Sequence, residues 1–182
     1  MANCCDYEMK IKGSKEAIQR VIDCLKADYD YDEGKPSHKH FFRVFSVYDD
    51  EPLEDNGDGT FTKYIFGDCA WSVYSCMCRG GSTYYDYCKM EHPDTFMGTN
   101  LTEQSQDCEI EIFSEEPGCE FSEHYIYKNG ECLADDCVDV EQGSYDDDGN
   151  ITTEIDWDEY DGDQLCLNPH RYKFTENYRW EI

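Results

Sequence analysis

The hydrophobic period changes within the first 27 residues, and this change constrains the fold more than any other feature of the chain. Apolar and charged residues alternate over 7–12, which predicts a half-buried strand that ends at Gly13. Ser14 is a suitable helix N-cap, and apolar side chains then recur three and four positions apart over 14–27. The chain therefore opens with a predicted strand, turn and helix.

The rest of the chain carries many strand signals and few helix signals. Only 5 Ala and 6 Leu are present, which favours sheet over helix. Asn129-Gly130 lies between two alternating runs and is typical of a hairpin turn. A short helical turn is predicted at 101–106, and a bulge or break is expected near Gly67-Asp68. Strands are predicted at 40–48, 61–77, 108–114, 121–128, 131–140 and 171–182.

The charge of the chain is large and unevenly distributed. The 182 residues include 42 Asp+Glu and 15 Lys+Arg, a formal charge of −27. Residues 1–91 hold 17 acidic and 11 basic side chains, whereas residues 92–182 hold 25 and 4. Between 129 and 170 there are 14 carboxylates and no Lys or Arg. Direct binding to nucleic acid or to an anionic membrane is excluded, because such ligands have the same sign of charge.

Three interpretations of the acidic stretch stay open. It can be solvated surface, as most charge runs are. It can be a calcium site, because 55–59 and 146–150 resemble fragments of a calcium loop, although neither supplies the carboxylate expected at the twelfth position. It can also imitate nucleic acid, since arginine binds carboxylate and phosphate with the same fork of donors.

The 12 cysteines are expected to be mostly free thiols in a soluble, cytosolic protein. No stretch has the length of a signal peptide or a membrane span, and Asp6 interrupts the start of the chain. Cys76, Cys78, Cys88 and His92 are close in sequence but do not have zinc-site spacing. No catalytic motif is recognisable, and Glu109 and Glu111 are interpreted as exposed strand carboxylates. We therefore expect no enzyme activity and no cofactor.

Three segments resemble the ferredoxin-like domains of the YubB type found on plasmids and phages. They are MANCCDYEMKIKGSKEAIQRVIDCLK at the start, CAWSVYSCM in the centre, and the later EIEIFSEEPGCEFSEHYIYKNGE. The resemblance covers 1–142 without the loops 49–60 and 79–99. It implies an α+β fold with a mainly antiparallel sheet and ferredoxin-like elements. We expect one domain, divided into a core at 1–142, an acidic insertion at 143–168 and a closing strand at 169–182.

The whole chain is also similar to small acidic anti-CRISPR proteins that inhibit the type II effector Cas9. That similarity implies a protein partner with a basic channel for guide RNA and target DNA. Alternatives are a metal-dependent enzyme that cleaves guide RNA, and a structural or host-interaction module. Tyr145, Trp157 and Tyr160 are candidate aromatic anchors. The predicted partner-binding residues are Asp135, Asp136, Asp139, Glu141, Asp146, Asp147, Asp148, Glu154, Asp156, Trp157, Asp158, Glu159, Tyr160, Asp161 and Asp163.

Overall fold

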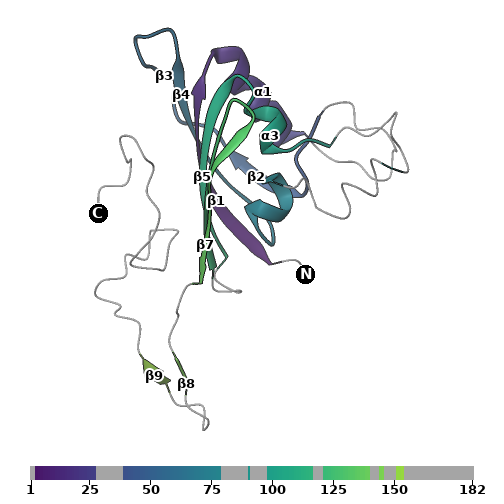
Figure 1. Cartoon of the computed structure of the whole chain (residues 1–182), viewed down its shortest axis with the longest axis vertical. Coiled ribbons are helices and arrows are strands. Elements are labelled where there is room, and N and C mark those ends of the chain that lie inside the picture. The colour runs from purple at the N-terminus through teal and green to yellow at the C-terminus, as the bar shows by residue number, and fades with distance from the viewer. Residues whose placement is uncertain are drawn as a thin grey trace.

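The computed structural model describes residues 3–27, 39–78, 90, 98–116, 121–139, 144–145 and 151–153. Its elements are β1 (Cys4–Gly13), α1 (Lys15–Lys26), β2 (Val44–Tyr48), β3 (Glu54–Asp55), β4 (Phe61–Ala70), the π-helix η1 (Tyr74–Cys78), α3 (Leu101–Gln104), β5 (Cys108–Glu116), β6 (Phe121–Lys128), β7 (Glu131–Asp139), β8 (Ser144–Tyr145) and β9 (Ile151–Thr153). The main sheet has the strand order β2-β4-β1-β5-β6-β7, β3 pairs with β4, and all these pairs are antiparallel (Figure 1). The predicted α+β class with a mainly antiparallel sheet is confirmed.

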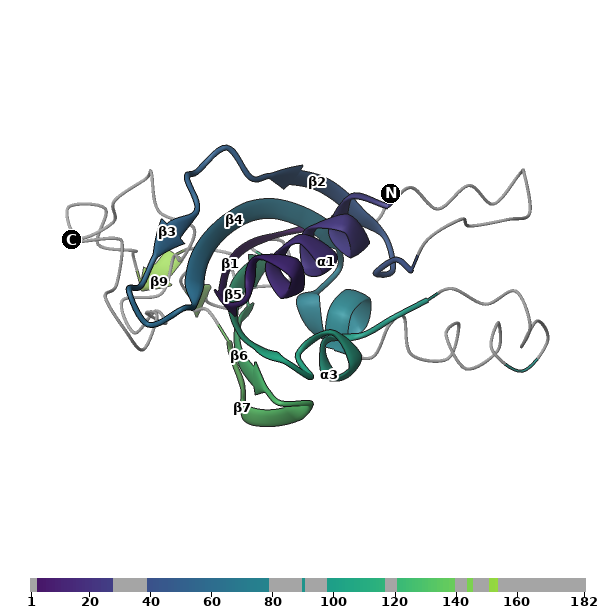
Figure 2. The ribbon, with the colours of Figure 1, turned by 90° about the horizontal axis from the view of Figure 1, so that it is seen from above.

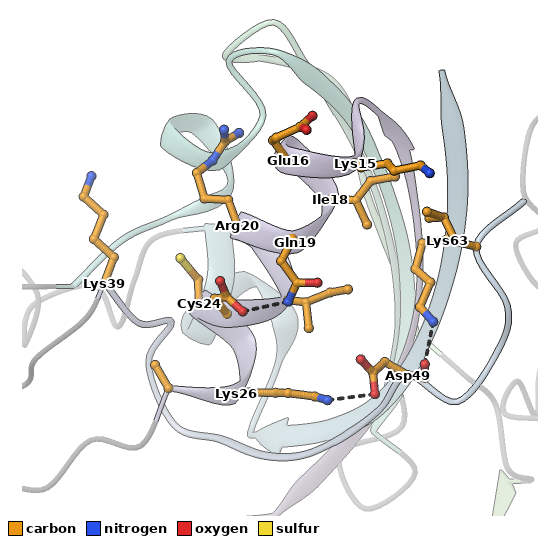
Figure 3. A pocket seen from close by; sticks show the side chains of 14 residues that line it. Lys15, Glu16, Ile18, Gln19, Arg20, Cys24, Lys26, Lys39, Asp49 and Lys63 are labelled. Atoms are coloured by element: carbon orange, nitrogen blue, oxygen red, sulfur yellow. Dashed lines mark hydrogen bonds and ion pairs between the residues drawn. The ribbon is translucent and has the colours of Figure 1, made fainter. Parts of the chain in front are cut away.

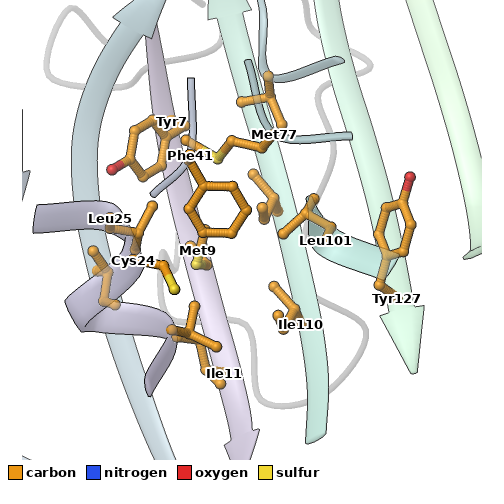
Figure 4. Packing of buried hydrophobic residues seen from close by; sticks show 14 of the residues in the cluster. Tyr7, Met9, Ile11, Cys24, Leu25, Phe41, Met77, Leu101, Ile110 and Tyr127 are labelled. Atoms are coloured by element: carbon orange, nitrogen blue, oxygen red, sulfur yellow. The ribbon is translucent and has the colours of Figure 1, made fainter. Parts of the chain in front are cut away.

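The predicted strand, turn and helix at the start of the chain are confirmed, but the expectation of a half-buried strand is wrong: Glu8 and Lys10 are buried as well, because β1 lies inside the sheet. The Ser14 side chain accepts a hydrogen bond from the Ala17 N–H at 3.1 Å and caps α1. The apolar stripe of α1 packs on the face of β1 that carries Tyr7, Met9 and Ile11, and both surfaces are buried. The two helices α1 and α3 lie on this same face of the sheet (Figure 2). The core is therefore one layer of side chains between the sheet and its helices (Figure 4).

Two of the predicted strands are shorter than the apolar pattern indicates. In the run 40–48, only Val44–Tyr48 is strand, because Arg43 has a φ of 47° and turns the backbone out of the extended region. In the run 61–77, β4 ends at Ala70 because Trp71 has a φ of 65°, and the apolar residues that follow belong to η1. The break expected near Gly67-Asp68 does not occur, since both residues pair with β1 inside β4, but a bulge lies at this place: the register of β2 shifts at Phe45, opposite Asp68 and Cys69.

The second half of the sheet follows the local turn signals. Asn129 and Gly130, at φ values of 51° and 80°, join β6 to β7 as predicted. The strand expected at 108–114 continues to Glu116 as β5, and α3 forms within the predicted helical turn. Of the predicted acidic insertion the structure describes β8 and β9, which pair with each other. The predicted closing strand at 169–182 lies outside the described residues.

Gly67 provides a test of how closely β1, β2 and β4 pack. A methyl group at this position would overlap the Ser46 carbonyl oxygen and the Tyr7 ring. We therefore expect Gly67→Ala to lower the free energy of unfolding by at least about 2 kcal/mol, measured by urea denaturation. Gly57→Ala is the control, because its surroundings are open and only its φ of 78° opposes a side chain. An equal or larger loss in the control would contradict this packing.

Candidate functional site

The acidic strand β7 forms one end of the main sheet. Within the described residues it pairs only with β6. Glu131, Asp135 and Asp136 are exposed, and Asp139 is the last residue of the strand. Leu133 is the extra residue at a register shift between β6 and β7, and its side chain is also exposed. This strand therefore presents carboxylates at a free edge of the described sheet, which discourages pairing with a copy of itself.

The structure tests the placement of only part of the predicted partner-binding set. Asp135, Asp136 and Asp139 lie together on β7, as expected from the hairpin. The backbone of Tyr145 lies in β8. The remaining predicted residues lie outside the described part of the chain: Glu141, Asp146, Asp147, Asp148, Glu154, Asp156, Trp157, Asp158, Glu159, Tyr160, Asp161 and Asp163.

Of the two calcium-like fragments, 55–59 serves the fold, and 146–150 lies outside the described residues. In the first calcium-like fragment, Asp55 accepts from the Gly57 N–H at 2.8 Å and Asp58 accepts from the Thr60 N–H at 2.9 Å, so both carboxylates hold a turn. Cys76 and Cys78 are buried in η1, whereas Cys88 and His92 lie outside the described residues. Among the residues that the structure describes, no group of three or more His, Cys, Asp or Glu side chains has the arrangement of a metal site.

The face of the sheet opposite α1 carries a buried ion-pair network. Glu111 of β5 is fully buried, with its two carboxylate oxygens 2.8 Å from Lys10 Nζ and 2.9 Å from His124 Nε2. The register explains this contact, because Lys10 lies directly opposite Glu111. The interpretation of Glu111 as an exposed strand carboxylate is therefore wrong. Glu109, two residues earlier, does lie near the surface and pairs with Lys128 at 2.7 Å.

A second buried carboxylate connects β6 to η1. Glu123 accepts hydrogen bonds from the backbone N–H groups of Val73 and Tyr74 at 2.9 and 3.3 Å, and from the hydroxyls of Ser114 and Tyr125 at 2.8 and 3.1 Å. Burial raises the pKa of Glu123, and these four hydrogen bonds lower it in part. Sequence reasoning missed this residue, because nothing near Glu123 in the chain indicates that η1 packs against it.

A groove of about 1010 Å³ runs along the outer surface of α1 (Figure 3). Its lining includes five basic side chains, each of which already has a contact within the described structure. Lys26 pairs with Asp49 at 2.7 Å, and Lys63 donates to the backbone carbonyls of Asp49 and Glu51. Lys15 Nζ lies 4.4 Å from the centroid of the Phe61 ring. Arg20 pairs with Asp107, and Lys39 pairs with Glu103. Three of these five cations are therefore paired with carboxylates, and the other two contact an aromatic ring or backbone carbonyls.

Comparison with known proteins assigns no relative to this chain. No family model, no curated protein and no solved structure matches it. Within the described residues, no helix is long and apolar enough to cross a membrane. Of the surfaces described here, the acidic edge at β7 has the chemistry that agrees with the charge distribution of the whole sequence.

Proposed function

We propose that this protein is a non-enzymatic inhibitor of a Cas9-type nuclease and places its acidic face on the basic surface that handles guide RNA and target DNA. The exposed acidic strand β7 is the observation that supports this function most directly. The strand lies near the start of the stretch 129–170, which contains no Lys or Arg. The inhibitor would act in the cytoplasm of the bacterial host, where the nuclease and its guide are found.

The density of charge on β7 supports this imitation. The strand carries four carboxylates among nine residues, and the adjacent, exposed Asp135 and Asp136 point to opposite faces because successive side chains alternate. Arginine binds each such carboxylate with the fork of donors that it offers a phosphate. Each exposed pair contributes little, about 0.2–1 kcal/mol, so many pairs must act together.

We further infer a ferredoxin-like core, in agreement with the resemblance to YubB-type domains. The elements β1, α1, β2, β4, α3 and β5 follow one another in a strand-helix-strand-strand-helix-strand order. Their strands lie in the order β2-β4-β1-β5, with both helices on one face. The β6–β7 hairpin extends this core at the β5 edge and carries the acidic strand outward.

Binding to a Cas9–guide complex, measured between about 50 and 200 mM salt, tests the proposal. We expect the dissociation constant to rise at least about tenfold over this range, because ionic contacts are screened. The triple variant D135N/D136N/D139N should bind about three- to hundredfold more weakly. The matched control D50N/E54Q/D55N removes three exposed carboxylates from β3 and the segment that precedes it. Flat salt dependence, or an equal loss in the control, would contradict docking through β7.

Incubation of the protein with guide RNA and Mg²⁺ separates inhibition from catalysis. We expect the RNA to stay intact in the absence of the nuclease. Cleavage by the purified protein alone would overturn the non-enzymatic proposal and would favour the metal-dependent alternative.

A further inference from the structure

Arg43 and Trp71 form an exposed contact at the β2 edge of the sheet, and the exposed Phe45 follows Arg43 by two residues. Arg43 precedes β2, Phe45 is the extra residue at the register shift between β2 and β4, and Trp71 follows β4. Phe45 and Trp71 are 51% and 43% exposed, although both are large and apolar. The Arg43 guanidinium carbon lies 4.6 Å from the centroid of the Trp71 ring. We call these three residues the Arg43–Trp71 corner.

The backbone holds this corner in an unfavourable conformation. Arg43 and Trp71 have φ values of 47° and 65°, in the left-handed region that glycine and asparagine tolerate best. Hydrogen bonds fix both positions, since the Arg43 carbonyl accepts from the Ala70 N–H at 3.1 Å and the Trp71 N–H donates to the Asn3 carbonyl at 2.9 Å. Non-glycine residues in this region cost about 1–3 kcal/mol each and are concentrated at functional sites.

The recorded contact of the Arg43 guanidinium is with an aromatic ring and not with a carboxylate. Within the described residues, ion pairs with carboxylates are formed by Lys10, Arg20, Lys26, Lys39 and Lys128. Arg43 forms no such pair in this part of the chain, although the whole sequence contains 42 Asp and Glu residues. Contact with the Trp71 ring does not use the N–H donors of Arg43, so the guanidinium can also bind a carboxylate of another molecule.

We propose that the Arg43–Trp71 corner is a second docking surface, which inserts Trp71 and Phe45 into an apolar pocket of the partner protein while Arg43 binds a carboxylate on the rim of that pocket. The chemistry is that of an interface anchor, where Trp and Arg supply most of the binding energy. A protein surface suits the corner better than an RNA strand, because the net charge of −27 repels phosphate. The inference rests on the proposed function, since the partner is the Cas9-type nuclease.

Trp71→Gly separates binding from folding, because glycine accepts the φ of 65° that strains tryptophan. We expect this variant to keep its unfolding temperature within a few degrees and to bind the Cas9–guide complex at least about thirtyfold more weakly. Arg43→Lys keeps the charge but loses the planar fork, and should bind about tenfold more weakly. Tyr48→Ala is the control, because it removes a 59% exposed aromatic side chain from β2, the strand that contains Phe45. It should change binding less than about twofold.

Arg43→Glu tests the sign of the contact. A carboxylate in the partner repels the new carboxylate, so this variant should bind more weakly than Arg43→Lys. Tighter binding would place the corner against the basic channel and overturn the inference. Binding of the wild type to guide RNA alone, lost in Arg43→Glu, would also overturn it and assign the corner to RNA.

The same titrations distinguish failure of this inference from failure of the proposed function. If the wild type binds the complex and Trp71→Gly binds equally well, the corner is not an anchor and the inhibitor proposal stands. If the wild type does not bind the complex, the proposed function is wrong and the inference is overturned with it.

Discussion

Replacing Glu111 by alanine is expected to lower the free energy of unfolding by about 3–5 kcal/mol, because the substitution removes the carboxylate from a buried ion pair. Glu111 is fully buried, and its oxygens lie within 2.9 Å of Lys10 and His124. The alanine variant leaves the Lys10 ammonium in a poorly hydrated position without this counter-charge. Urea denaturation followed by circular dichroism measures the loss.

Two further variants identify the cause of this loss. Glu109→Ala removes a carboxylate from the same face of β5, but its pair with Lys128 is near the surface, so we expect a loss below about 1 kcal/mol. The double variant Lys10→Met/Glu111→Leu replaces the buried charges by apolar groups of similar size and should recover most of the stability. If Glu111→Ala lowers the free energy of unfolding no more than Glu109→Ala does, burial does not determine how much the Lys10–Glu111 pair contributes to stability.

Replacing Glu123 by alanine is expected to cost about 3–5 kcal/mol, because four hydrogen-bond donors lose their common acceptor. Two of these donors are backbone N–H groups at the start of η1, so the loss should also loosen η1. Hydrogen exchange at Val73 and Tyr74 would report that loosening directly. Ser114→Ala removes one donor and leaves the carboxylate in place, and it should cost only about 1 kcal/mol.

The pH dependence of stability has a defined sign at Glu123. Burial raises its pKa above the ordinary value of 4.5, so the folded state holds this proton more tightly than the unfolded state. The resulting stabilisation is fully present below pH 4.5 and is lost as the pH rises through the folded pKa. The unfolding free energy of the wild type minus that of Glu123→Gln should therefore have its highest value on the acidic side and fall as the pH rises. A wild type that gains stability relative to the variant as the pH rises would contradict this direction.

The elements that could be predicted from the sequence are specified by residues that lie close together in the chain. The Ser14 cap with its apolar stripe specifies α1, and Asn129-Gly130 specifies the β6–β7 hairpin. These signals act over a few positions, so a period and a turn type are enough to recognise them. The acidic edge at β7 could be predicted for the same reason, since carboxylates and strand pattern occupy the same stretch of sequence.

The remaining features depend on pairings between distant parts of the chain. Lys10, Glu111 and His124 meet only because β1, β5 and β6 are neighbours in one register. An alternating pattern shows which residues share a face of a strand, but it does not show which charges of another strand lie opposite. The left-handed conformations of Arg43 and Trp71 carry no local signal either, because neither residue type favours that region.

The central position of β1 determines when the sheet can form during synthesis. Within the main sheet, β1 precedes both of its neighbours in the chain, with Met9 paired to Ile65 of β4 on one side and Ile112 of β5 on the other. The helix α1 can cover the apolar face of β1 at once, but both edges of β1 must wait for strands that are synthesised much later. Such long-range pairing slows folding and exposes unpaired strand edges in the meantime. A nascent chain of this protein needs protection from aggregation until β5 has been synthesised, whatever the stability of the finished sheet.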